Sequence, residues 1–342
     1  MIDVNISPLQ TVRNYKINSL EIDENIIPDI SSAVQENFVL PNCLFKQSAN
    51  INLVHKMSDV LDQNSEKSNL NYSFCIDRSG DKPAVIGFSS NENLIENIVL
   101  QVNNYVSGKA IIRLNSVDFH NGRVKFVLGE SASLDCVLIV EGGKNSFLSI
   151  QTELDPNSNF DLTLIDFSSG LSAQNVYFSQ VGQGSKTNLK SIYFGDGKFD
   201  LNYLSDLMGQ NSVCQINCVG ALFGNARKNF KGTINFVKGA SHSYGDENEY
   251  CLLLSKDAQA KALPMLLCGE EDVDGKHSTA VGQVDESQMF YCMSRGLNKS
   301  EAQKLVVKAK FSKILNQLFD ENIKNEVLDK IDSIFVSSEN ND

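Results

Sequence analysis

Residues 110–140 read AIIRLNSVDFHNGRVKFVLGESASLDCVLIV, and they contain three short apolar runs separated by polar turns. The runs, 110–114, 124–128 and 134–140, are rich in valine, isoleucine and leucine, and the Asn121-Gly122 pair between the first two is typical of a turn. Runs of this length are too short for stable helices, and their composition favours β-strands. This stretch therefore predicts a chain built from many short strands.

The same pattern of short apolar runs separated by polar turns continues to residue 268. Further runs begin roughly every 10 to 20 residues in this stretch. They are 147–151, 160–165, 176–181, 189–194, 213–223, 233–237, 250–254 and 264–268. No helical pattern long enough for a crossover separates them, which excludes a doubly wound sheet. An antiparallel sandwich or barrel and a parallel β-helix remain. The gaps are uneven and often long, whereas a sandwich needs frequent two-residue hairpins, so we expect the β-helix.

The two ends of the chain have different patterns. Residues 1–85 mix apolar and polar stretches without a lasting period, and after Gly282 the apolar period becomes helical. Capping boxes at residues 285–288 and 298–301 begin two helices, and a third carries the apolar positions of 323–335. We predict a small mixed N-terminal region at 1–85, a parallel β-helix core at 86–284 and a C-terminal helical domain at 285–342.

Composition narrows the function classes. The 342 residues include 30 Lys and Arg against 42 Asp and Glu, a formal net charge of −12. Such a chain repels phosphate backbones and anionic membranes, which disfavours nucleic-acid and membrane partners. A leader-like start and an apolar run of the ~18 residues that a membrane span requires are both missing, so we expect a cytoplasmic protein. Its eight scattered cysteines predict reduced thiols.

Soft metal ligands gather near residue 270. If the strands stack as coils, Cys251, Cys268 and His277 lie on neighbouring coils ~4.8 Å apart, and thiolate with imidazole suits iron or zinc. The alternative is that the cysteines pack as small hydrophobic residues while His277 caps a turn. Cys214 and Cys218 are different, since four residues on a strand span about 13 Å, too far to share one ion. We expect those two thiols to line the core or a face.

Catalytic motifs are missing from the sequence. It has no nucleophile elbow, no HExxH motif and no acid/base carboxylate pair, so we expect a protein that is not an enzyme. The loop 182–187 differs from a phosphate loop because Ser185 separates the glycine from the lysine and a strand follows, so no bound nucleotide is expected. A polysaccharide lyase or hydrolase on a β-helix stays as an alternative, although the coils show mostly Ser, Asn and Gln where such an enzyme needs Asp, Lys and Arg.

Residues 274–297, DGKHSTAVGQVDESQMFYCMSRGL, closely resemble the C-terminal signature of the SufB/SufD family of iron–sulfur cluster assembly proteins. The resemblance covers about residues 110–319. It implies a right-handed parallel β-helix core, a variable N-terminal part and a C-terminal helical domain. This agrees with the architecture expected from the strand and helix patterns.

The resemblance also implies a role as a scaffold subunit of the SUF complex. Such a subunit pairs through its β-helix with a SufB/SufD-type subunit or with itself, and its C-terminal helices bind a SufC-type ABC ATPase. The signature residues expected at the ATPase surface are Phe290, Tyr291, Ser294, Arg295, Gly296 and Leu297. The second helix is basic, which indicates either a solvated face or a docking surface.

Two positions match family residues thought to face each other where the cluster forms. Cys251 falls at the SufB cysteine and His277 at the SufD histidine, so both are candidate ligands of a transient iron–sulfur cluster, with Cys268 a further candidate. Ser278 stands where SufB has Glu, and Gly275 where SufD has Cys, so the subfamily stays open. The alternative is a purely structural assembly subunit without metal ligands.

Overall fold

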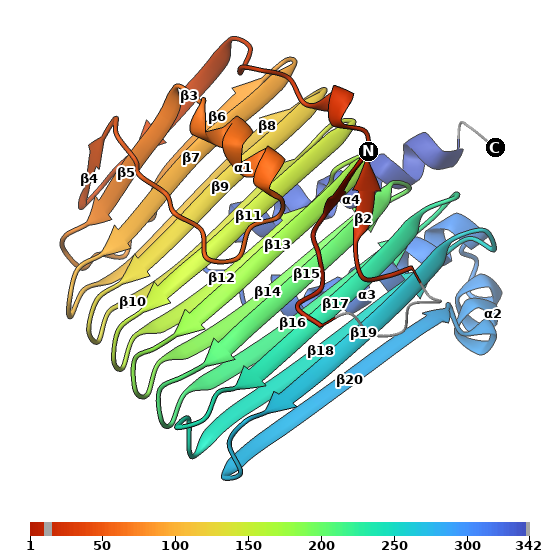
Figure 1. Cartoon of the computed structure of the whole chain (residues 1–342). Coiled ribbons are helices and arrows are strands. Elements are labelled where there is room, and N and C mark those ends of the chain that lie inside the picture. The colour runs from red at the N-terminus through yellow and green to blue at the C-terminus, as the bar shows by residue number, and fades with distance from the viewer. Residues whose placement is uncertain (10–15, 340–342) are drawn as a thin grey trace.

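The computed structural model describes residues 1–9 and 16–339. Within this part, two nine-stranded sheets face each other along a β-solenoid of about eight turns (Figure 1). Sheet 1 contains β3 (Val34–Val39), β6 (Ala84–Ser90), β8 (Ser107–Ser116), β10 (Ser133–Glu141), β12 (Asn159–Asp166), β14 (Lys186–Gly195), β16 (Val213–Leu222), β18 (Ser243–Leu253) and β20 (Val273–Gln283). Sheet 2 contains β4 (Cys43–Lys46), β5 (Leu70–Ile76), β7 (Asn93–Val102), β9 (Phe119–Leu128), β11 (Asn145–Leu154), β13 (Leu171–Gln180), β15 (Lys198–Leu207), β17 (Arg227–Phe236) and β19 (Gln259–Cys268).

Each coil contributes one strand to each sheet, and strands of successive coils pair in parallel from β5 onward. The predicted mainly β fold with a parallel β-helix core is therefore confirmed, and the sandwich is excluded. Parallel pairing already begins at Leu70, inside the stretch for which the sequence predicted a mixed region. β5 alternates strictly between buried and half-buried residues, a pattern too short to stand out beside the polar residues around it.

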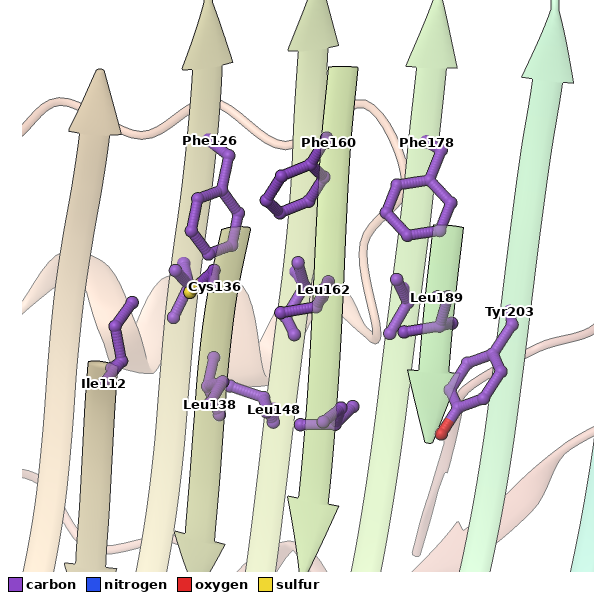
Figure 2. Close-up of a cluster of buried hydrophobic side chains, with 14 of the residues drawn as sticks. Ile112, Phe126, Cys136, Leu138, Leu148, Phe160, Leu162, Phe178, Leu189 and Tyr203 are labelled. Atoms are coloured by element: carbon purple, nitrogen blue, oxygen red, sulfur yellow. The ribbon is translucent and has the colours of Figure 1, made fainter. Parts of the chain in front are cut away.

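The core lies between the two sheets, where inward side chains of successive coils stack (Figure 2). Phe126 on β9 and Phe160 on β12 approach with ring centroids 4.7 Å apart, and Phe178 on β13 lies beyond them. Early coils are 26 residues long, as the pairing of Ser133 with Asn159 shows. Equal coil lengths keep like residues in register, so each coil buries the apolar layer of the one before.

The N-terminal region caps and covers the solenoid. β3 and β4 pair antiparallel with the first coil and close that end of the sheets. The two-stranded sheet of β1 (Ile2–Val4) and β2 (Leu20–Ile22), the short helix Glu24–Ile26 and α1 (Asp59–Glu66) lie across the outer face of sheet 2 (Figure 1). A buried ion pair of 2.7 Å between Arg123 on β9 and Asp62 on α1 fastens this cover.

In the described part of the chain, three helices follow β20: α2 (Glu286–Ser294), α3 (Lys299–Leu315) and α4 (Glu321–Glu339). α3 and α4 pack on the outer face of sheet 1 through a second core in which Phe311 and Phe335 meet Phe194 of β14. The predicted capping box of Asn298 and Glu301 is present at the start of α3. α2 lies beside the β20 end of the solenoid (Figure 1).

Candidate functional site

Cys251 lies on the inner face of β18, fully buried in the solenoid core. The strand alternation turns the next residue, Leu252, outward against the helices. Burial raises the pKa of the Cys251 thiol to about 11, so the thiol is protonated at neutral pH. Metal binding at this sulfur would have to displace that proton.

His277 lies on β20, one coil further on, and its side chain is exposed. Its register partner on β18 is Glu247, while Cys251 pairs with Val281. The two candidates are thus four positions out of register on adjacent strands, about 13 Å along the strand direction. The structure puts them on the same inner face but does not bring them within one ligand shell.

The remaining thiols considered from the sequence lie on strands other than those of Cys251 and His277 in the described part of the chain. Cys268 is exposed at the end of β19, and Cys214 and Cys218 are buried on the inner face of β16. Among residues 1–9 and 16–339, no group of three or more His, Cys, Asp and Glu side chains is spaced to hold a metal ion.

A buried polar cluster surrounds Cys251. Lys228 on β17 and Glu249 on β18 form an ion pair of 2.6 Å, and both are fully buried. The Tyr193 hydroxyl donates to the same Glu249 Oε1 at 3.1 Å. Gly220, between Tyr193 and Cys251 in the register, leaves room for the ring, since a Cβ there would lie 1.9 Å from it. Sequence reasoning missed this cluster because polar residues on a strand are normally assigned to the solvent face.

Glu247 is the unusual member of the cluster. Its carboxylate lies over Gly232 of the opposite sheet, where a Cβ would come within 1.9 Å of Oε1. Both carboxylate oxygens are buried, and neither has a hydrogen-bond partner among the described residues. Burial, followed by the nearby charge of Glu249, raises the pKa of Glu247 to about 8. The group is therefore mostly neutral at pH 7.

The solenoid ends in an open edge. β20 is the last strand of sheet 1, and within the described chain only β18 pairs with it. Nearly all of its residues are exposed, including those on the inner face that a further coil would cover. An unpaired strand of this length is a template for pairing with another chain. His277 belongs to this edge, and the Cys251 layer lies one coil beneath it.

The predicted partner-binding residues lie on α2 and directly after it. Phe290 and Tyr291 are 75 % and 60 % exposed, which is high for aromatic side chains. Arg295 lies 5.4 Å from the Tyr291 ring centre, and the Ser294 hydroxyl donates to the Tyr291 carbonyl. Gly296 has a φ of +98°, a value that glycine adopts without strain.

A groove of about 580 Å³ separates α2 from α3. Its lining includes Tyr291, Leu305, Val306, Ala309 and Lys310. The basic residues of α3 are not all free to meet a partner, because Lys308 pairs with Asp332 of α4 at 2.6 Å. Lys310 also lies 4.3 Å from the centre of the Tyr250 ring, so the groove rather than the whole lysine row is available for docking.

These features define a class of protein: a parallel β-solenoid with an open final coil, a buried thiol beneath it and an exposed helix beside it. Residues 86–310 match the family described as "SUF system FeS cluster assembly, SufBD core domain". The chain belongs to the SufBD family.

Several curated relatives carry iron–sulfur cluster assembly in their names. The chain is similar to SufD of Bacillus subtilis, with 31 % identity over 153 residues that cover 44 % of this chain and 35 % of that protein. It is 34 % identical to Escherichia coli SufD over 102 residues, 30 % of this chain and 24 % of that protein. SufD of Plasmodium berghei is 25 % identical over 350 residues, 90 % of this chain and 26 % of that protein. The chain thus spans about a third or less of the length of these relatives.

Within the described residues, no helix is both long and apolar enough to cross a membrane.

Proposed function

We propose that this chain is a scaffold subunit of a SUF complex that acts in the cytoplasm and builds iron–sulfur clusters for transfer. The open β20 edge is the observation that carries the proposal, because it exposes an inner strand face that a second subunit of SufBD type would cover. The second subunit is another copy of this chain or a relative. The role is assembly rather than catalysis.

In this proposal the cluster is cargo held at the subunit boundary. His277 is exposed on the edge strand and accessible to a metal carried by the partner. Cys251 lies one coil deeper with a protonated thiol, so it would bind iron only after the last coil shifts and the proton leaves. Cys268, at the exposed end of β19, is a third candidate.

Anaerobic reconstitution of the complete complex tests the ligand roles. We expect Cys251→Ala and His277→Ala each to lower bound iron and sulfide by at least roughly tenfold, since even mutation of the groups that hydrogen-bond to metal ligands costs about ten- to a hundredfold in affinity. Matched controls are Cys136→Ala, a buried thiol in the middle of the solenoid, and His242→Ala, an exposed histidine on a turn. If both candidate variants load like the controls while the complex stays assembled, the chain is a purely structural subunit.

We also propose that α2 and the adjoining groove bind a SufC-type ABC ATPase. The exposed aromatic residues Phe290 and Tyr291 supply the apolar anchors that helix-in-groove docking uses. Co-purification of the ATPase should fall at least about tenfold with Tyr291→Ala, as for a typical anchor residue. Tyr105→Ala, at an equally exposed tyrosine distant in sequence from the helices, is the control. Equal recovery with both variants would contradict this docking site.

A further inference from the structure

A cationic cavity lies where the strands of sheet 2 begin, beside the N-terminal segment. It measures about 280 Å³. Four of its lining residues are basic and exposed: Lys16 from the N-terminal segment, Lys198 from β15, Arg227 from β17 and Lys261 from β19. None of the described residues that line it is acidic. In a chain of net charge −12, such a concentration of positive charge stands out.

The strand register places two of these cations side by side, which destabilises the fold when no anion is bound. Lys198 and Arg227 are direct neighbours on adjacent parallel strands, where like charges repel and destabilise the sheet. An uncharged side chain at the first position of either strand would therefore make the fold more stable. A cost of this kind is offset when an anion binds between the two cations.

Nearby carboxylates do not provide that compensation. Asp200, two residues after Lys198 on β15, is buried and bonded to Lys231 at 2.6 Å and to the Asn5 side chain at 2.7 Å. Lys228 also borders the cavity, but its ammonium group is turned into the core against Glu249. Asp200 and Glu249 are each engaged with a buried lysine, so neither carboxylate offsets the charges of Lys198 and Arg227.

We propose that this cavity binds a small oxyanion that carries several negative charges, such as a diphosphate or a tricarboxylate. Guanidinium and ammonium groups are the side chains that recognise both chemistries. The buried Phe199 and the half-buried Leu20 supply apolar lining beside the charges. The volume is slightly below the range of sites for larger organic ligands, which favours a compact anion.

The site draws on two parts of the chain. Lys16 and Leu20 come from the N-terminal segment, whereas Lys198 and Arg227 begin solenoid strands. A bound anion would join these parts, so it would stabilise the docking of the N-terminal segment on sheet 2. This inference is independent of the scaffold role proposed above.

Calorimetric titration of the full chain at low salt with diphosphate and, separately, with citrate tests the inference. We expect each of Lys198→Gln and Arg227→Gln to weaken the tighter-binding anion about tenfold, in line with loss of one charge-assisted contact. Lys186→Gln removes the equivalent exposed lysine at the start of β14, outside the cavity, and should leave binding unchanged. Tighter diphosphate identifies a phosphate-type ligand, and tighter citrate a polycarboxylate.

Lys16→Gln provides a second variant that does not alter a solenoid strand, so a folding defect in the strand variants would not obscure the result. We expect it also to weaken binding several-fold. The proposal is overturned if neither anion binds the wild type, or if Lys198→Gln, Arg227→Gln and Lys16→Gln bind as tightly as Lys186→Gln.

Discussion

Replacing Glu247 with glutamine should stabilise the protein, and the gain should grow as the pH rises. In the unfolded chain a glutamate ionises near pH 4.5, whereas in the folded protein its pKa is raised to about 8. Between these values the folded state keeps a proton that the unfolded state has lost, so wild-type stability falls as the pH rises through this window. At about 1.4 kcal/mol per pH unit, the cost is roughly 3 kcal/mol at pH 7 and about 4 kcal/mol at pH 8, where the folded-state carboxyl itself begins to ionise. Glutamine cannot ionise, so it avoids this cost.

Thermal or urea denaturation of wild type and Glu247→Gln at pH 5, 6, 7 and 8 measures the effect. The buried amide has its own desolvation cost, but that cost is the same at every pH, so the slope of the difference is the informative quantity. Glu249→Gln is the matched control, because it leaves the Lys228 ammonium group buried without a counter-charge and should destabilise by about 3–5 kcal/mol. A stability difference for Glu247→Gln that is flat across this range would refute the reasoning.

Three further predictions concern the core and the thiols. Gly220→Ala should lower the melting temperature, because the added Cβ would lie 1.9 Å from the Tyr193 ring; an unchanged melting temperature would show that the ring can move. Phe311→Ala should destabilise the packing of the helices on sheet 1 by about 3–5 kcal/mol, measured by denaturation, and a loss under 1 kcal/mol would contradict the buried contact with Phe194. Iodoacetamide at pH 8 should modify the exposed Cys268 much faster than the buried, protonated Cys251, as peptide mapping would detect; equal rates would mean that the last coil opens readily.

The short apolar runs predicted the strands, their uneven and often long gaps favoured the solenoid over a sandwich, and the helix caps predicted the C-terminal helices. The relation between Cys251 and His277 was harder to predict. They are 26 residues apart, the length of an early coil, and equal coils would place them in direct register. The last coil has 30 residues, so His277 pairs with Glu247 instead. Extra residues in the turns between strands do not change the apolar pattern of the strands, so that pattern does not reveal them.

The polar interior could not be predicted for a different reason. Lys228, Glu249 and Glu247 occupy inward positions, and a charged residue on a strand is ordinarily assigned to the outside. Glycines at 220 and 232 carry the available signal, since Gly220 leaves space for Tyr193 on the neighbouring strand and Gly232 for Glu247 on the opposite sheet. Without the register, however, no sequence pattern says which side chain fills the space.

A solenoid is close to a one-dimensional stack of coils, and a coil's place in the stack determines how readily it unfolds locally. A middle coil is held on both sides, whereas the coil ending in β20 has one neighbour within the described chain. Fraying therefore begins at this end, and amide hydrogen exchange should be fastest in β20 and slow progressively toward the middle of the stack. His277 lies on the coil that opens most often, and Cys251 on the coil directly below it. Any molecule that covers the edge would slow exchange at both positions together.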